Sequence, residues 1–221
     1  MFVNSSRTSS IDFIKSHTEI ISNPLIPELS LYMVTENCPM WRMNEDDVAE
    51  LGIEAPYWGF SWPGGHALAR HIIDHPQLVK NKTILDFGTG AGIVAIAASI
   101  AGAKKVIACD TDPLALDATQ LNASLNKVKI ETCPENLIGT YDPQWEVILA
   151  ADVCYEAQLT EEIAQWLHQM HGKRIEVLFA DPKRGWLQQH SVREVAQYET
   201  PCDIDCRGTY LQNTYVYSWS S

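Results

Sequence analysis

The sequence predicts an α/β protein built on a doubly wound, mostly parallel β-sheet with helices on both faces. Two observations lead to this fold class. Near-continuous apolar runs, typical of buried parallel strands, alternate with amphipathic helical segments over residues 83–181. The chain has 221 residues, of which 46% are hydrophobic, which is enough for one well-buried domain. We therefore expect a single domain over residues 1–221, with a helical and aromatic lead-in over 1–75 and a regular, Rossmann-like body over 76–221.

The lead-in is expected to be helical. Isoleucines at helical spacing predict a first helix, which Ser10 caps and a proline-containing segment ends. A second, short helix should begin at Asn44 and end at Gly52. An aromatic loop then leads to a third helix, which Pro76 stops. The expected ranges are 11–21 for the first helix, 44–52 for the second, 55–65 for the loop and 66–75 for the third.

The body alternates strands and helices in the order expected of crossover units. Its strands are expected over 83–87, 105–110, 128–133, 145–152 and 174–181, and its helices over 92–103, 112–126 and 157–171. A last strand over 213–219 follows without a long crossover helix, which is compatible with an antiparallel strand at the end of the sheet.

The overall charge limits the partners of the chain. Its 28 acidic and 16 basic residues give a formal net charge of −12, which opposes binding to nucleic acid or to an anionic membrane. Its apolar stretches are shorter than the ~20 residues that a membrane span needs. Residues 1–22 lack the apolar core of a secretory signal. We expect a monomer in the cytoplasm, or in the mitochondrial matrix if the source is eukaryotic, with neither a nucleic-acid nor a membrane partner.

The cysteines indicate reduced thiols and no metal site. No two of the six form a C-x-x-C pair, and several lie in or beside buried-looking segments. The cysteines are Cys38, Cys109, Cys133, Cys154, Cys202 and Cys206.

A glycine-rich turn follows the first strand of the body and points to a nucleotide-type cofactor. Dinucleotide enzymes usually have a third small residue in this turn, where this chain has Ile93 after Gly88, Gly90 and Gly92. Asp86, just before the turn, would repel a pyrophosphate and attract a cofactor that carries positive charge. S-adenosylmethionine, with its ammonium and sulfonium groups, meets that requirement.

Polar residues at the next two strand ends extend this prediction. Asp110 lies 20 residues beyond Gly90, where an acidic side chain can bind the hydroxyls of a ribose. Asp112 is better explained as the cap of the following helix. Glu135 and Asn136 follow the third strand, at a place where their side chains could bind the edge of an adenine ring.

Asp152 and Tyr155, after the fourth strand, are the candidates for the reacting end of the site. A carboxylate there could orient an amine, and a phenol could share its hydrogen bonds. A turn aspartate beside a tyrosine packed in the core is the structural alternative. The chain has no NPPY-type stretch, which disfavours methylases of amides and nucleobase amino groups.

Five motifs resemble one family in the same order. They are "PYWGFSWPGGHALARHIIDHP", "LDFGTGAG", "ACDTDP", "ADVCY" and "ADPKRG". The sequence is similar, over roughly residues 11 to 219, to the seven-β-strand methyltransferases related to the electron-transfer flavoprotein β-subunit lysine methyltransferase. The resemblance implies a seven-stranded sheet, S-adenosylmethionine as cofactor and transfer of methyl groups to nitrogen.

The resemblance also implies roles for individual residues. Asp152 and Tyr155 would position the substrate amine, whereas Asp181 and Arg184 belong to a characteristic turn with no assigned role. The residues expected to hold the cofactor are Trp62, Asp86, Gly88, Thr89, Gly90, Gly92, Asp110, Thr111, Asn136 and Ala151.

The expected acceptor is a lysine side chain of a protein, either the electron-transfer flavoprotein β subunit or a ribosomal protein. A small-molecule N-methyltransferase of the nicotinamide type is the first alternative. Its pyridine substrate would stack on Tyr57, Trp58, Phe60 and Trp62, which could equally form a hydrophobic plug between the lead-in and the sheet. A module that binds the cofactor without catalysis is the second alternative.

Overall fold

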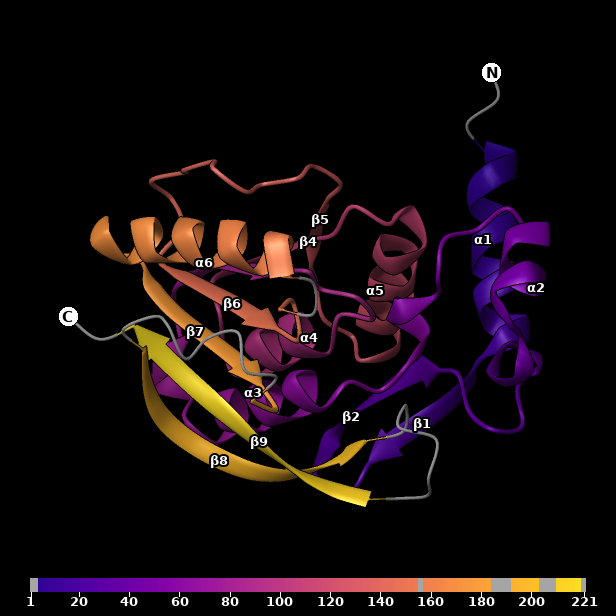
Figure 1. The fold of residues 1–221 in the computed structure, drawn as a ribbon, viewed down its shortest axis with the longest axis horizontal. Coiled ribbons are helices and arrows are strands. Elements are labelled where there is room, and N and C mark those ends of the chain that lie inside the picture. Colours follow the sequence, from indigo (N-terminus) through magenta and orange to yellow (C-terminus); the bar gives the residue numbers. More distant parts are fainter. Residues whose placement is uncertain (1–3, 155–156, 184–191, 203–209, 220–221) are drawn as a thin grey trace.

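A computed structural model describes residues 4–154, 157–183, 192–202 and 210–219. Its main sheet has seven strands in the order β5-β4-β3-β6-β7-β9-β8 (Figure 1). Neighbours from β5 to β7 are parallel, and β9 is antiparallel to both β7 and β8. The α/β class and the mostly parallel, seven-stranded sheet are thus confirmed. The strands are β3 Thr83–Phe87, β4 Lys105–Cys109, β5 Glu131–Cys133, β6 Val147–Ala151, β7 Glu176–Asp181, β8 Val192–Cys202 and β9 Tyr210–Trp219.

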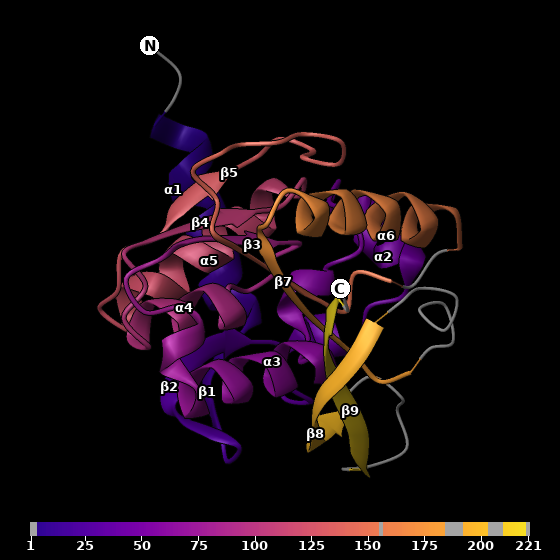
Figure 2. The ribbon, with the colours of Figure 1, turned by 90° about the vertical axis from the view of Figure 1, so that its left-hand side faces the viewer.

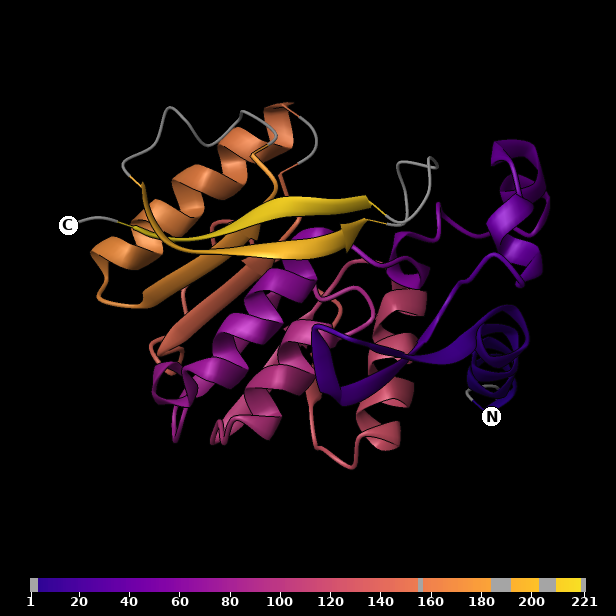
Figure 3. The ribbon, with the colours of Figure 1, turned by 90° about the horizontal axis from the view of Figure 1, so that it is seen from below.

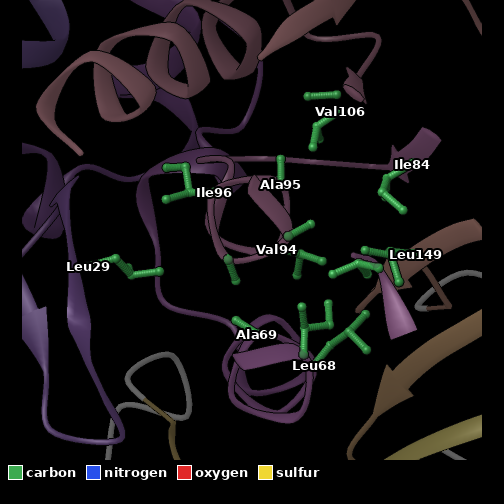
Figure 4. Close-up of a cluster of buried hydrophobic side chains, with 14 of the residues drawn as sticks. Leu29, Leu68, Ala69, Ile84, Val94, Ala95, Ile96, Val106 and Leu149 are labelled. Atoms are coloured by element: carbon green, nitrogen blue, oxygen red, sulfur yellow. The ribbon is translucent and has the colours of Figure 1, made fainter. Parts of the chain in front are cut away.

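Helices cover both faces of this sheet because its central strands are apolar on both sides. Ile84 and Leu149 face α3 (Pro63–Asp74) and α4 (Ile93–Ile100), whose Leu68 and Val94 complete this half of the core (Figure 4). Leu85 and Ile148 are the neighbours of Ile84 and Leu149 in the same strands, so they face the other side of the sheet, where they pack with α6 (Ala157–Gly172). Burial of each such side chain contributes about 1.5–3 kcal/mol to the free energy of folding. Helices α3, α4 and α5 (Pro113–Leu125) lie side by side in Figure 3.

The expectation of a first helix over 11–21 is wrong at both ends. Helix α1 spans Asn4–His17, so Ser10 lies inside it and donates a hydrogen bond to Asp117 of α5 instead of capping the helix. The chain then forms a hairpin of β1 (Glu19–Asn23) and β2 (Ile26–Met33), which makes a second, two-stranded sheet. The lead-in is therefore mixed rather than purely helical.

The hairpin forms because β2 alternates apolar and polar residues and finds partners in the tertiary structure. Ile26, Leu29, Leu31 and Met33 are buried in the same cluster as the apolar faces of α3 and α4. Figure 2 shows the hairpin beside these two helices. Side chains of α5 complete the backbone hydrogen bonding of β2, for example Asn122, whose Oδ1 accepts from the Tyr32 amide at 2.7 Å. The spacing of Ile11, Ile14 and Ile21, which predicted a helix, gives no sign of these contacts between distant segments.

The second helix and the aromatic segment follow the sequence prediction closely. Helix α2 spans Glu45–Glu50 with Asn44 as its N-cap, and Asn44 and Asp47 bind each other's backbone amides in a capping box. Gly52 follows with a φ of 68°. Short 3-10 turns occur at η1 (Pro39–Arg42), η2 (Tyr57–Gly59) and η3 (Pro76–Leu78). Helix α3 begins at Pro63, three residues before the predicted start, because proline suits the first position of a helix.

Strand β8 was not predicted, whereas the antiparallel direction of the last strand is confirmed by β9. β8 lies at the edge of the sheet, and a bulge between Glu194 and Ala196 breaks its alternation of residue types. Charged and polar side chains dominate its exposed face, so it pairs through backbone hydrogen bonds and shows little apolar pattern.

Two further features bear on predictions made from the sequence, namely the state of the cysteines and the length of the apolar helices. Cys38, Cys109 and Cys154 are buried free thiols, and Cys133 is a half-buried one. No helix within the described ranges is both long and apolar enough to cross a membrane.

The order of strands reverses between β3 and β6, since β4 and β5 lie on one side and β7 on the other. Ligands of open α/β sheets bind at such a reversal, beyond the carboxyl ends of the strands.

Candidate active site

A cavity of about 660 Å³ lies at this reversal of strand order. That volume is in the range of pockets that hold a nucleoside-sized ligand. Its wall is formed by the ends of β3, β4 and β6, by the aromatic segment before α3, and by side chains of α6. The predicted site residues that line it are Trp62, Asp86, Gly88, Thr89, Gly90, Asp110, Thr111, Asn136, Ala151 and Asp152.

The glycine loop is held in place by the next strand and helix. The amides of Gly88 and Thr89 both donate to the carbonyl of Cys109, at 2.9 and 3.0 Å. From α5, the Thr119 hydroxyl donates to the Gly90 carbonyl at 3.0 Å, and the Asn122 amide group donates to the Ala91 carbonyl at 2.9 Å. These bonds fix the backbone that faces the cavity before any ligand arrives.

Glycine is needed in this loop for two different reasons. Gly88 has a φ of 67°, and a Cβ there would lie 2.7 Å from a methyl group of Val153. Gly92, with a φ of 85°, is the N-cap of α4, and a Cβ there would lie 3.0 Å from the Thr119 side chain, but Gly92 does not line the cavity. Gly92 therefore supports the loop from behind, whereas the sequence had assigned it to the cofactor.

Asp86 is 2% exposed and lies under the loop. Its Oδ2 accepts hydrogen bonds from the Thr89 hydroxyl at 2.6 Å and from the Ala95 amide at 3.1 Å. Burial raises the pKa of Asp86 to about 7, against the opposing effect of these two hydrogen bonds. Thr89, a predicted cofactor residue, thus directs its hydroxyl to Asp86. A cationic ligand beside Asp86 would favour the ionised carboxylate.

The raised pKa of Asp86 gives a prediction for stability. Because the folded protein holds this proton more tightly than the unfolded chain, ionisation of Asp86 opposes folding as the pH rises from about 4 to about 7. We expect Asp86→Asn, compared with the wild type without ligand, to become more stable by a margin that grows to the order of a few kcal/mol over this range. Urea unfolding at several pH values measures the margin. A margin independent of pH would contradict the raised pKa.

Asp110 ties the end of β4 to the glycine loop. Its Oδ2 accepts from the Gly90 amide at 2.9 Å, and its Oδ1 accepts from the Asp112 amide at 3.1 Å. The carboxylate can accept more hydrogen bonds than these two, which a ribose hydroxyl can use. Burial raises the pKa of Asp110 above its usual range. Asp112 caps α5 by accepting from the Leu114 amide, which confirms the assignment made from the sequence.

We expect Asp110→Ala to weaken the binding of S-adenosylhomocysteine. Each charge-assisted hydrogen bond to a ribose hydroxyl contributes roughly 1.5–3 kcal/mol, or about one to two decades of affinity. Calorimetry measures the loss, and Asp112→Ala serves as a control that removes a nearby carboxylate with a capping role. Equal affinities for wild type and Asp110→Ala would reassign Asp110 to support of the loop alone.

The remaining predicted cofactor residues also line the cavity. Asn136 is exposed, and its Oδ1 accepts from the Ile138 amide at 3.0 Å in a local turn. Thr111 is exposed and Ala151 is half-buried. Trp62 donates from Nε1 to the Tyr57 carbonyl at 2.8 Å, which sets the angle of its ring at the entrance.

The aromatic segment has two parts with different roles. Trp58 is 2% exposed and packs with Ile14 of α1 and Ala115 of α5, so it joins the lead-in to α5 and not to the sheet, and it also lines the cavity. Tyr57, by contrast, is 57% exposed, and its ring is tilted by 55° from that of Trp62. The two rings are therefore not parallel walls for a flat substrate.

Asp152 is positioned by a contact that the sequence did not predict. It has a φ of 57°, a conformation that aspartate tolerates better than most residues. Its Oδ2 accepts at 2.9 Å from the amide of Gly65, in the first turn of α3, where the helix dipole attracts negative charge. A Cβ at Gly64 would lie 2.5 Å from the same Oδ2 and 2.7 Å from the Ala180 carbonyl. The two glycines of the Trp-Pro-Gly-Gly stretch thus make room for Asp152 and bind it.

Ser61 and His66 form a buried polar pair in the cavity wall that sequence reasoning also missed. They are 5% and 3% exposed, and Oγ of Ser61 lies 3.1 Å from Nε2 of His66. Nδ1 of His66 lies 2.9 Å from the Trp62 carbonyl, which can only accept, so Nδ1 carries a proton. In the neutral ring Nε2 then accepts from Ser61, and the pair connects the aromatic segment to α3.

Three predicted residues remain to be placed. Asp181, at the end of β7, is 3% exposed. Tyr155 and Arg184 lie outside the described residues.

The chemistry of the wall fits S-adenosylmethionine. Within the described part of the chain, the wall contains six carboxylate side chains and no lysine or arginine, so a pyrophosphate would meet only negative charge. A cation is favoured there instead. The positive φ values of Gly88 and Gly90 bring the backbone to the cavity without a Cβ in the way. The sheet order and this fit together place the chain among the class I methyltransferases that depend on S-adenosylmethionine.

Comparisons with known proteins agree with this class and narrow it. The sequence model of the ribosomal protein L11 methyltransferase family matches residues 67–174. The electron transfer flavoprotein beta subunit lysine methyltransferase of Xenopus laevis is 40% identical over 201 residues, which are 87% of this chain and 80% of that protein. The Homo sapiens protein of the same name is 34% identical, over 84% of this chain and 72% of its own length. This chain therefore belongs to the family of electron-transfer flavoprotein β-subunit lysine methyltransferases.

Solved structures share the fold at low sequence identity. The ribosomal protein L11 methylase of Lactobacillus delbrueckii subsp. bulgaricus superposes with a TM-score of 0.53 at 21% identity, covering 92% of this chain and 100% of that one. The magnesium protoporphyrin IX methyltransferase of Synechocystis PCC 6803, solved with bound S-adenosylmethionine, gives a TM-score of 0.51 at 14% identity, covering 71% and 80%.

Proposed function

We propose that this methyltransferase modifies the side-chain nitrogen of a lysine in a protein, with the electron-transfer flavoprotein β subunit as the first candidate. The observation that carries the proposal is the place of Asp152, at the cavity wall across the strand reversal from Asp110. The curated relatives named for that substrate support the choice of protein. The family model named for ribosomal protein L11 makes a ribosomal protein the second candidate.

Methyl transfer requires the protein to align the lysine nitrogen more than to provide a strong base. A lysine in water has a pKa near ~10.4 and must lose its proton before its nitrogen can attack. S-adenosylmethionine, when bound, supplies a methyl group on a positively charged sulfur. Asp152 is held by the Gly65 amide, and we propose that its carboxylate accepts a hydrogen bond from the substrate amine, which fixes the direction of the nitrogen. Tyr155, three residues on in the sequence, is proposed to share that amine.

Roles for the rest of the site follow from their contacts. We propose that Asp110 holds the ribose, that Gly88 and Gly90 admit the methionine end, and that the carboxylate of Asp86 attracts the charge of the ligand from beneath the loop. Trp62 would close the entrance. The single domain over residues 1–221, the monomeric state and the absence of a nucleic-acid partner are part of the same proposal. Light scattering of the purified protein tests the monomer.

One experiment separates the proposed acceptor from its alternatives. The protein is incubated with methyl-labelled S-adenosylmethionine and with recombinant electron-transfer flavoprotein β subunit, ribosomal protein L11 or nicotinamide in separate reactions. A heat-treated cell lysate serves as a fourth acceptor. We expect label on lysine of a protein, located by mass spectrometry. Label on nicotinamide alone would establish the small-molecule reading, and binding of the cofactor without transfer in any reaction would establish the non-catalytic one.

A further inference from the structure

A second cavity of about 410 Å³ lies beside the first, between α2 and the aromatic segment. Its floor and sides are mostly apolar, and Ala55, Tyr57, Phe60 and Trp62 line both cavities. We call it the α2 groove. Since the two cavities share these four residues, a chain lying in the α2 groove would reach the entrance of the cofactor cavity. The other apolar residues of the α2 groove are Met43, Val48, Ala49, Ile53 and Pro56.

The α2 groove is exposed although its lining is apolar. Helix α2 has no buried residue, and it stands at the edge of the molecule, away from the main sheet (Figure 1). Leu51 and Tyr57, on the chain that borders the groove, are 45% and 57% exposed. Exposed apolar area of this kind, next to a catalytic cavity, is typical of a surface that binds another molecule.

The segment that carries α2 is strongly acidic, and one of its acids, Glu45, lines the α2 groove. Residues 36–54 contain six acidic side chains and one basic side chain, a net charge of −5. No ion pair joins any of these acids to a base in the described part of the structure. The acids on α2 are Glu45, Asp46, Asp47 and Glu50, and all four are exposed. An acidic border around an apolar floor suits a peptide with basic residues beside an apolar one.

We propose that the α2 groove binds the segment of the substrate protein that flanks the target lysine, with an apolar side chain in the groove and basic side chains at its border. The proposal rests on the proposed function, because a lysine acceptor in a protein brings a flanking segment with it. The shared wall of Tyr57 and Trp62 would then deliver the lysine toward Asp152. The negative border would also speed the encounter with a basic segment at low salt.

Charge reversal on α2 tests the border. Asp46→Lys with Glu50→Lys reverses two exposed charges one helical turn apart and leaves the Asn44–Asp47 capping box intact. We expect the KM for electron-transfer flavoprotein β subunit to rise about fivefold or more, with kcat and the affinity for S-adenosylhomocysteine unchanged. The control is Glu161→Lys with Glu162→Lys, the same number of charge reversals at exposed acids of α6, a helix that does not line the α2 groove and that Figure 1 shows apart from α2. The control should change KM less than twofold.

Filling the groove tests its floor independently of charge. Ala49 is exposed and lines the α2 groove, so Ala49→Trp would occupy it without displacing a buried side chain. This variant should raise the same KM by about tenfold and leave cofactor affinity unchanged. If the wild type methylates the protein and both α2 variants match the α6 control, the α2 groove is overturned as the docking site while the proposed function stands. If the wild type labels no protein, the proposed function fails, and the groove proposal fails with it.

Discussion

Asp152→Asn is expected to lower methyl transfer about a hundredfold while leaving the fold and the cofactor affinity close to those of the wild type. Asparagine keeps an oxygen for the Gly65 amide and tolerates the φ of 57° at this position. It loses the negative charge, and its amide group presents donors where a substrate amine needs acceptors. A misplacement of the reacting nitrogen by ~1 Å can cost about a hundredfold in rate. Single-turnover transfer at saturating cofactor measures the effect.

Two measurements accompany this variant. The affinity for S-adenosylhomocysteine shows whether the cofactor site survives, and Tyr155→Phe provides a milder comparison, because it removes one hydrogen bond and no charge. We expect damage in the order Asp152→Asn, then Tyr155→Phe. Transfer by Asp152→Asn at the wild-type rate would leave Asp152 with the structural role that its bond to α3 also allows.

Gly64→Ala is expected to be nearly as damaging, for a steric reason. The new Cβ would meet both Oδ2 of Asp152 and the carbonyl of Ala180, and the carbonyl is backbone at the end of β7 and cannot turn away. Either α3 or Asp152 must move. Overpacking of this kind costs about 1–3 kcal/mol, and a displaced Asp152 would lower methyl transfer by a further large factor. Thermal unfolding and single-turnover transfer separate the two effects.

Other glycines provide graded controls for this variant. A Cβ at Gly65 would meet only a methyl group of Ile93 at 3.0 Å, so Gly65→Ala should be milder in both measurements. Gly172, at the end of α6, has no atom within 4 Å of an added Cβ, and Gly172→Ala should leave transfer unchanged. Equal activity of Gly64→Ala and Gly172→Ala would show that Asp152 does not depend on close packing against α3.

The parts of the fold that could be predicted are those in which a local pattern coincides with burial on both faces. Strand β3 and helix α4 follow this rule, because Ile84 and Leu85 are both fully buried and the helix after the glycine loop is apolar at every position except Ser99. The N-terminal hairpin and β8 did not follow it. Ile20 and Ile21 lie in a strand although the isoleucine spacing suggested a helix, and β8 is an edge strand interrupted by a bulge.

The sequence by itself determined the class of cofactor and the edge of the sheet where it binds. Asp86 and the glycines are neighbours along the chain, and Asp110 ends the next strand, so spacing alone brings them to one place. Only the tertiary structure decided how the carboxylates are held. Asp152 meets Gly65 across 87 positions of sequence, and Asp110 meets Gly90 across 20. Such contacts depend on how α3 packs on the sheet and on which loops adjoin at its edge. Contacts between separate segments leave no periodic signal in the residues that make them.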